Sequence, residues 1–139
     1  MCSFGYNFLG ACKDVIAIET LWIFYHSSLQ YVNVVKVSEQ ILTCDLSTDC
    51  VHAFCTMVYA KNKYQERRSF WHDLLSLSRT IQDPWFLIGD FNAIFSPSEK
   101  IAPSHSSISS REFKASIENC DLIEINLTGA KYTWYRKCL

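Results

Sequence analysis

Two polar side chains, Asp90 and Asn92, follow a short apolar run and are of the types that act on phosphate esters. The run from Trp85 to Ile88 is rich in aromatic and branched residues and lies between a proline and a glycine, which predicts a strand buried on both faces. Side chains alternate along an extended chain, so Asp90 and Asn92 are expected to point the same way and Phe91 the opposite way. A carboxylate can accept a proton from water or bind a metal-bound water, and a carboxamide can donate to an oxyanion.

The segment Gly89 to Asn92 also has the composition of a tight turn. Aspartate and asparagine hydrogen-bond to their own backbone, and glycine tolerates a positive φ. The four residues alone favour this turn, so the catalytic interpretation depends on the sequence around them.

The composition is that of one globular domain. The chain has 139 residues, of which 49% are hydrophobic and 14% aromatic, with only 4 glycines and 3 prolines, which argues against a disordered chain. The net charge of −1 predicts no basic surface, so nucleic-acid binding has to be argued from the site. No run approaches the roughly 20 apolar residues of a membrane span, and we expect a soluble protein.

Seven cysteines are present, an odd number, and no pair has the Cys-x-x-Cys spacing of a zinc or redox motif. Cys44, Cys55 and Cys120 lie in apolar stretches and are expected to be buried thiols that pack as small hydrophobes. No secretory signal is recognisable in the first residues. These features favour a reducing intracellular compartment, the nucleus or the cytoplasm, over a disulfide framework.

Strands are expected on both sides of the Trp85 run. Apolar patterning predicts them over residues 21–25, 31–37, 40–46 and 51–60, and again near 122–125 and 131–135. Within the second of these segments the alternation slips by one residue at Val34-Val35. A Ser- and Pro-rich surface loop is expected over 96–110.

Two helices are expected among these strands. Phe70, Leu74, Leu77 and Ile81 recur at helical spacing, which predicts a helix over 65–81 that lies on a sheet. Ser109-x-x-Glu112 has the form of a capping box and predicts the start of a second, shorter helix. Strands and helices alternate loosely, which indicates one layered domain.

Several segments, in order along the chain, resemble one known family. The stretch Pro84 to Lys100 resembles the central motif of the endonuclease/exonuclease/phosphatase superfamily, and Val58 to Ala60 and Glu66 to Trp71 resemble the segments before it. Leu21 to Tyr25 and Gly129 to Trp134 extend the similarity on both sides. Their order and spacing are most similar to the endonuclease region of plant LINE-type non-LTR retrotransposons.

The resemblance implies an α+β fold, a partial DNase I-like two-sheet sandwich with helices packed on the outside. Residues 1–139 would form a single, incomplete domain, because the family's glutamate-bearing early strand and its terminal Ser-Asp-His segment have no counterpart here. Missing strands leave open sheet edges, so we expect marginal stability or a tendency to aggregate.

The resemblance also implies magnesium-dependent hydrolysis of phosphodiester bonds in DNA. A metal and fixed donors would stabilise the charge that develops on phosphoryl oxygens. By position, Asp90 would activate the water, Asn92 would donate to the phosphate, and Tyr59 would place its hydroxyl nearby. Trp134 and its neighbour Thr133 would contact the DNA.

Each of these residues also has a structural interpretation. Tyr59 alone fits a core tyrosine, and Trp134 alone a packing aromatic. Glu99 could support the site from its loop, but a solvated acid is favoured there. The four histidines show no ligand spacing, so none is assigned as a base, and no residue is assigned as a metal ligand.

One carboxylate beside a carboxamide is a poor magnesium site, because that ion usually takes one or two carboxylates besides waters and phosphate oxygens. We therefore expect a fragment of a metal-dependent DNA endonuclease domain with weak or no activity. Two alternatives stay open: a noncatalytic α+β module that binds protein or nucleic acid, and a truncated phosphoesterase of small molecules. No specific protein partner is predicted, and the resemblance favours DNA.

Overall fold

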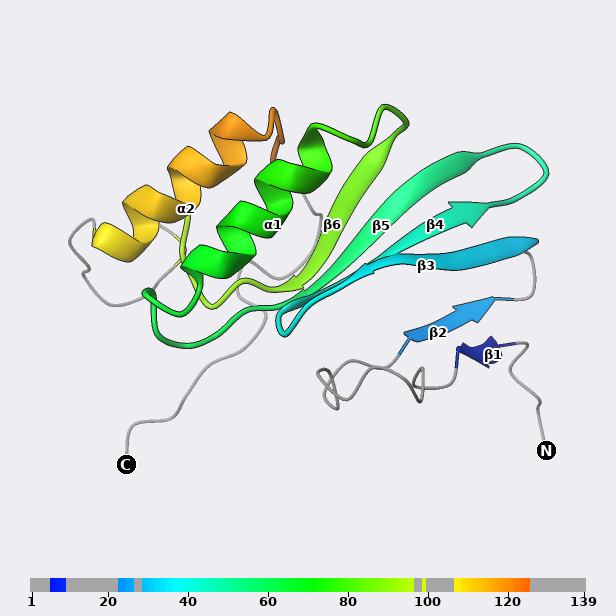
Figure 1. Cartoon of the computed structure of the whole chain (residues 1–139), viewed down its shortest axis with the longest axis horizontal. Helices are drawn as coiled ribbons and strands as arrows, with labels where there is room; N and C mark the ends of the chain where they lie inside the picture. Colours follow the sequence, from blue (N-terminus) through cyan, green and yellow to red (C-terminus); the bar gives the residue numbers. More distant parts are fainter. Residues whose placement is uncertain (1–5, 10–22, 27–28, 97–98, 100–106, 126–139) are drawn as a thin grey trace.

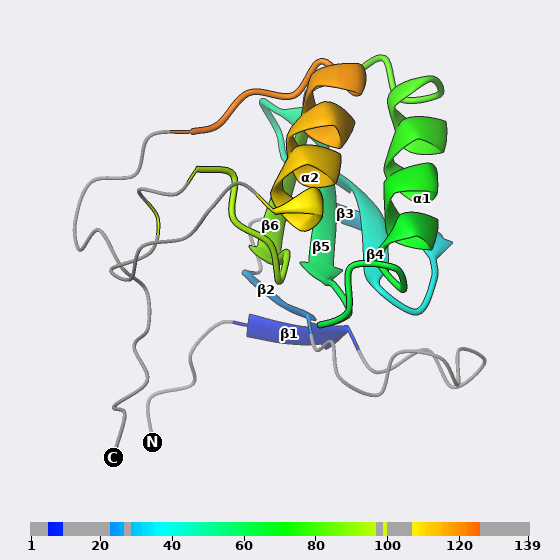
Figure 2. The ribbon, with the colours of Figure 1, turned by 90° about the vertical axis from the view of Figure 1, so that its left-hand side faces the viewer.

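The fold is α+β, as predicted. A computed structural model describes residues 6–9, 23–26, 29–96, 99 and 107–125. Within these residues, a four-stranded mixed sheet carries two helices on one face, and a separate two-stranded sheet lies on the other side (Figures 1 and 2).

The larger sheet begins as an antiparallel meander whose strands follow one another through short turns. Its strands are β3 (Tyr31–Val37), β4 (Ile41–Ser47) and β5 (His52–Tyr59). The pairing of β3 with β4 shifts between Val34 and Lys36, where the apolar alternation slips in the sequence. An extra residue in one strand accounts for both observations, because a bulge moves the following side chains to the other face.

The helices α1 (Arg68–Ser78) and α2 (Ile108–Asn119) cover one face of this sheet (Figure 2). The helical spacing predicted the buried stripe of α1 correctly, although the helix is shorter than 65–81 because residues 64–67 form turns before it. The core joins both helices to the sheet through buried apolar side chains, among them Ile41, Val58, Phe70, Trp71, Leu74, Leu77 and Phe113.

The strand predicted at Trp85 is β6 (Trp85–Asp90), which pairs parallel to β5 after the chain crosses the sheet as α1. The prediction that it is buried on both faces is wrong. Phe86 is 41% exposed and Ile88 60% exposed, while Leu87 packs against the core. Among the described residues β6 is the last strand in the order β3-β4-β5-β6, and the helices cover only one of its faces.

Gly89 was expected to end this strand, but β6 continues through it to Asp90. The residue has a φ of +139° and is the register partner of Val58 on β5. A Cβ atom at this position would lie 2.0 Å from the Val58 carbonyl oxygen. The two strands therefore approach so closely here that glycine is required.

Three polar side chains link β4, β5 and β6 on the helix-facing side of the sheet. The Thr43 and Thr56 hydroxyl oxygens are 2.9 Å apart, and the Trp85 indole N–H donates to the Thr56 hydroxyl over 2.9 Å. Both threonines are fully buried. The contacts satisfy polar groups that would otherwise be unpaired in the core.

The second sheet is a pair of short antiparallel strands, β1 (Tyr6–Leu9) and β2 (Ile23–His26). The strand predicted over 21–25 corresponds to β2, shifted by two residues at its start. Both views place the pair on the side of the larger sheet opposite the helices (Figures 1 and 2).

The beginning of α2 and the segment after it differ from the prediction. The residue that caps α2 is Ser107, whose hydroxyl accepts from the Ser110 N–H at 3.2 Å, so the expected capping box at Ser109 and Glu112 is wrong. Ser107 has the extended backbone that an N-cap requires. Residues 122–125 form no strand, and Ile123 is 87% exposed.

Cys44, Cys55 and Cys120 are buried, as predicted. The strand expected over 131–135 lies outside the described residues. In the part of the chain that the structure describes, no helix has the length and apolar character needed to cross a membrane.

Candidate functional site

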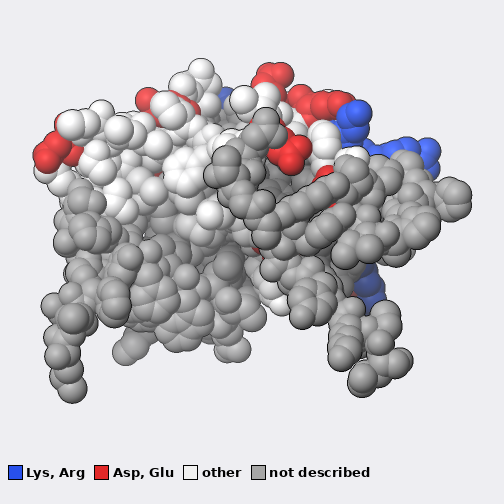
Figure 3. Space-filling model, turned by 180° about the vertical axis from the view of Figure 1, so that it is seen from behind, with Lys and Arg blue, Asp and Glu red and all other residues white. Residues whose placement is uncertain are grey.

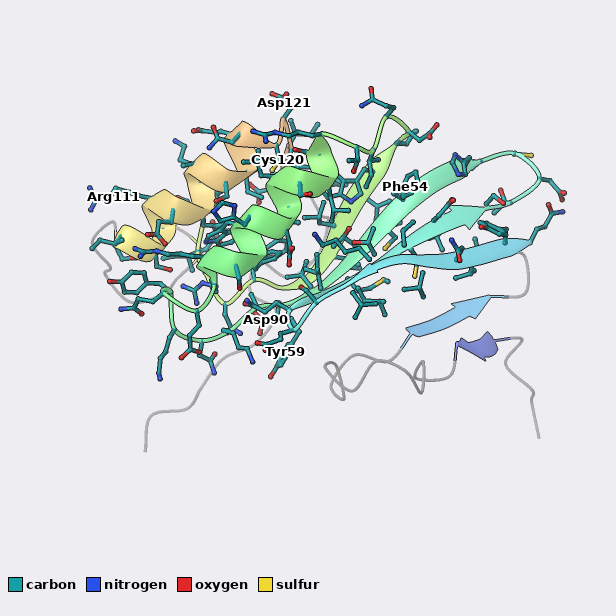
Figure 4. The ribbon with its side chains drawn as sticks, viewed as in Figure 1. Phe54, Tyr59, Asp90, Arg111, Cys120 and Asp121 are labelled. Carbon is teal, nitrogen blue, oxygen red and sulfur yellow. The ribbon has the colours of Figure 1, made fainter. Side chains whose placement is uncertain are left out.

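Tyr59 and Asp90 lie side by side where the parallel strands β5 and β6 end. They are register partners, and the Ala60 N–H donates to the Asp90 carbonyl oxygen at 2.8 Å, so the strands remain joined at this point. Figure 4 shows both side chains at the same end of the sheet. Tyr59 is 48% exposed, so it is no core tyrosine.

Asn92 holds the turn that follows β6. Its N–H donates to Asp90 Oδ1 at 2.9 Å, its Nδ2 donates to the Ala60 carbonyl oxygen at 2.6 Å, and its φ is +46°. This is the turn that the residue types alone favoured, since asparagine tolerates the left-handed conformation. The Asp90 carboxylate and the Asn92 amide therefore each form a hydrogen bond with the backbone, and one N–H donor of the Asn92 amide is already used by the Ala60 carbonyl oxygen.

The side chain of Phe91 points away from this turn, as the alternation predicted. Its ring stacks on that of Phe113 from α2 with 5.3 Å between centroids, and it lies 6.0 Å from the ring of Phe70 from α1. The apolar residue between two polar ones therefore anchors the turn in the core, which fixes where Asp90 and Asn92 emerge.

Asp90 and Asn92 line the same pocket, an open depression of about 580 Å³ between the ends of the strands and the start of α2. Its other walls are the loop between β5 and α1 and the first residues of α2. The lining residues are Asn62, Lys63, Tyr64, Gln65, Arg67, Asp90, Asn92, Ala93, Ile94, Ser107, Ser109 and Ser110. Tyr59 lies beside Asp90 but is not part of this lining.

Arg67 lines the pocket and is only 3% exposed. Its Nη1 donates to the carbonyl oxygens of Lys61 and Asn62 at 2.7 and 2.8 Å, and its Nη2 donates to the Ser109 hydroxyl. Burial lowers the pKa of this guanidinium from its usual value, and the Glu112 carboxylate opposes that shift. The side chain therefore joins the loop after β5 to the start of α2.

Arg67 was not predicted as a site residue. It is the N-cap of α1 and continues the buried stripe of that helix toward its start, three residues before Phe70 and seven before Leu74. A charged residue at that helical position signals a buried, bonded cation, because arginine is rarely buried without partners.

Gln40 fixes the same loop from the sheet side and is 2% exposed. Its Nε2 donates to the Glu66 carbonyl oxygen and the Ser69 hydroxyl, each at 3.0 Å, and its Oε1 accepts from the Lys61 N–H at 2.8 Å. The rim of the pocket between β5 and α1 is thereby held by two buried polar side chains, Gln40 and Arg67.

Glu99 does not line the pocket. Its carboxylate oxygens accept from the Phe95 and Ser96 N–H groups at 3.2 and 2.6 Å, and the residue is exposed. It is the solvated loop acid that was favoured, with the added role of closing a turn.

The described residues do not by themselves fit a magnesium site. Asp90 is the one carboxylate among the lining residues, and one of its oxygens accepts from a backbone N–H. Lys63 and Arg67 add positive charge to the same walls. Across the described residues, no group of three or more histidine, cysteine, aspartate or glutamate side chains is placed to hold a metal ion.

Charged groups also gather at the opposite end of the sheet. His52 on β5 lies with Nε2 2.7 Å from Asp45 Oδ1 and Nδ1 3.6 Å from Asp83 Oδ1, and its ring meets Phe54 edge to face. The hydrogen bond to Asp45 raises the pKa of His52, as do the charges of both aspartates, while burial opposes the shift. Figure 4 labels Phe54 far from Asp90, so this cluster is separate from the pocket.

Seen from behind, the described surface is mostly uncharged, and its acidic and basic side chains lie mainly along the upper rim (Figure 3). A broad basic face is therefore not present among the described residues of this view.

Thr133 and Trp134, expected to contact DNA, lie outside the described residues. Comparison of the chain with protein-family models and with curated proteins gives no match.

Proposed function

We propose that this chain is a DNA-binding relative of the metal-dependent phosphodiesterases, with a pocket that receives a backbone phosphate and hydrolyses it weakly or not at all. The observation that carries the proposal is that Asp90, at the end of β6, and Asn92, in the turn after it, line one open pocket together with Lys63 and Arg67. Ligands bind outside the carboxyl ends of parallel strands in many α/β proteins, and β5 and β6 end here in parallel.

The fold proposed with this function is the partial DNase I-like sandwich. It is supported by the apolar face that the larger sheet turns away from its helices. Register partners cross the four strands there in two rows, Val34-Cys44-Cys55-Phe86 and Val37-Leu42-Met57-Ile88. A face of this composition is what a second sheet packs against, and β1 and β2 lie on that side.

Weak hydrolysis follows from the bonds that the polar groups already make. Asp90 Oδ1 is bonded to the Asn92 N–H, and the Asn92 amide donates to the Ala60 carbonyl oxygen. An efficient site keeps its base and its donors free for the water and the developing oxyanion. The pocket lining also offers a single carboxylate, that of Asp90, toward a hard cation.

Plasmid nicking in the presence of magnesium tests the catalytic part of the proposal. The parent chain is compared with Asp90→Ala and with Asp90→Asn, whose side-chain oxygen can still accept from the Asn92 N–H. We expect no nicking above background in any of the three. Nicking by the parent that both variants abolish would show an active endonuclease and overturn the proposal of a weak site.

DNA binding, measured by fluorescence anisotropy with a short duplex at low salt, tests the phosphate site. Lys63→Glu at the rim is expected to weaken binding about tenfold, and Asp90→Asn to tighten it about twofold. Arg79→Glu is the matched control, because Arg79 caps the other end of α1 and makes the same charge change far from the pocket. If Lys63→Glu and Arg79→Glu reduce DNA affinity equally, or if the parent chain does not bind DNA, the pocket is not a phosphate-binding site.

A noncatalytic protein-binding module is a second candidate, favoured by the exposed edge of β6. Phe86 and Ile88 present apolar side chains beside a strand with one described neighbour, and such an edge can accept a strand from another protein. Ile88→Lys distinguishes the candidates: it should leave DNA affinity unchanged under the first and abolish partner or self-association under the second, measured by analytical ultracentrifugation.

A further inference from the structure

Two thiols face each other across the centre of the larger sheet. Cys44 on β4 and Cys55 on β5 are register partners, both are free, and they are 0% and 5% exposed. They lie on the side of the sheet opposite Thr43 and Thr56, whose hydroxyls meet on the helix-facing side. Neither thiol lines the pocket.

The spacing of this pair follows from the hydrogen bonds around it. The Thr48 N–H donates to the Val51 carbonyl oxygen, and the Tyr59 N–H donates to the Gln40 carbonyl oxygen, at 2.8 and 2.9 Å. These bonded pairs lie four positions on either side of Cys44 and Cys55 in a continuous register. Because bonded and non-bonded pairs alternate, the cysteines form a bonded pair, with Cα atoms about 5.5 Å apart.

That separation is within the range of disulfides, for which Cα atoms are usually about 4.4 to 6.8 Å apart. Cβ atoms of such a pair are about 5 Å apart, whereas a disulfide needs about 4 Å. The bond can therefore form if β4 and β5 move together locally, and the resulting strain makes it easy to reduce.

We propose that Cys44 and Cys55 are an oxidation site, which a small peroxide converts to a reversible disulfide between β4 and β5. One thiolate attacks a peroxide oxygen, the O–O bond breaks, and a sulfenic acid and hydroxide form. The second thiol attacks the sulfenic sulfur, the S–O bond breaks, and a water molecule leaves with the second proton. In sum, two thiols and one hydrogen peroxide give one disulfide and two waters.

The surroundings of the thiols determine how fast this happens. Burial raises the pKa of Cys44 and of Cys55 to about 11 each, and for Cys44 the neighbouring Cys55 and Asp45 add to the shift. The Cys55 thiol also donates to Met57 Sδ at 3.5 Å and must turn from it to reach its partner. Thiolate is therefore scarce near neutral pH, and the rate of oxidation should rise about tenfold for each pH unit up to the pKa.

The experiment uses the full chain in its folded, reduced state, treated with hydrogen peroxide. Free thiols are then alkylated in denaturant and the unreduced digest is analysed by mass spectrometry. We expect a cross-linked pair of peptides that contain Cys44 and Cys55, lighter by two hydrogen atoms than the sum of the free peptides and lost on treatment with dithiothreitol. Full alkylation of both residues, or linkage of either to Cys50 instead, would overturn the proposal.

Variants separate this pair from the other cysteines. Cys44→Ala and Cys55→Ala should each abolish the cross-link, whereas Cys120→Ala, at another buried thiol, should leave its yield unchanged. Because the wild-type peptide map alone decides the linkage, the test does not depend on either alanine variant folding.

Discussion

The two ends of the parallel strands β5 and β6 are held together in different ways. At the carboxyl end, Arg67 is buried and bonds to backbone carbonyl oxygens, and Gly89 lets the strands meet closely. At the amino end, His52 lies at the surface between two aspartates. The carboxyl end is held by the close approach of the strands and by buried hydrogen bonds, and the amino end is held by ion pairs at the surface.

This difference decides what each end can tolerate. Buried bonded groups cannot be removed without leaving their partners unpaired, so the carboxyl end should respond strongly to substitution and little to pH. Exposed ion pairs contribute little and are screened by salt, so the amino end should respond weakly to substitution and visibly to pH.

The largest effect is expected for Gly89→Ala. Its new Cβ atom would meet the Val58 carbonyl oxygen at 2.0 Å, and the φ of +139° is strained for any side chain. We expect a loss of about 4 kcal/mol in the free energy of unfolding, measured by urea denaturation. Ile88→Ala, at the exposed residue just before it, is the control and should change little. A fully stable Gly89→Ala variant would mean that β6 does not approach β5 so closely.

Arg67→Met should have the next largest effect. The methionine keeps the apolar stem but leaves the carbonyl oxygens of Lys61 and Asn62 without their donor. We expect a loss of about 3 kcal/mol by the same measurement. Arg68→Met is the matched control, since Arg68 is exposed and pairs with Glu112 at the surface. Similar losses from both variants would contradict the distinction between buried and exposed cations.

A moderate effect is expected at Asn92, where two causes can be separated. Asn92→Ala removes the hydrogen bond to the Ala60 carbonyl oxygen and puts a side chain at a φ of +46°, at a cost of about 2 kcal/mol. Asn92→Gly removes the same bond without the backbone strain and should cost about half as much. If the glycine variant is the less stable of the two, backbone strain does not contribute.

The smallest effect is expected for His52→Gln, and it should depend on pH. The folded state raises the pKa of His52, so the protonated histidine stabilises the fold below its unfolded pKa, near 6.5, and this contribution is lost as the pH rises through the folded pKa. The urea midpoints of parent and variant should therefore differ at about pH 5.5 and converge at about pH 8. If the difference between the two urea midpoints grows as the pH rises, the fold lowers the pKa of His52 and does not raise it. An NMR titration of the His52 ring checks the shift directly.

Much of this arrangement follows from the local pattern of the sequence. The stripe of α1, the hairpin of β3 and β4 with its bulge, and the buried cysteines each depend on residues that are neighbours in one element. The same holds for the turn at Asn92, which the residue types favoured. Patterns of period two and 3.6 report such features because one face of each element is buried.

What could not be predicted depends on contacts between distant segments. An apolar run has the same composition at the edge of a sheet as at its centre, so the exposure of Phe86 and Ile88 was missed. The role of Gly89 depends on Val58, and that of Arg67 on Ser109, which lies on α2. The pocket is therefore a tertiary feature, although Asp90 and Asn92 could be chosen from the sequence.

The crossover through α1 has a consequence for the order in which the molecule assembles. Strands β3, β4 and β5 follow one another in sequence and can pair through short turns. Strand β6 can pair with β5 only after the longer segment that contains α1 brings the two strands together. Contacts between distant residues carry the larger entropic barrier and form late. The groups around Asp90 should thus come together in the final stage of folding, and the amide protons of β6 should exchange with solvent before those of β4.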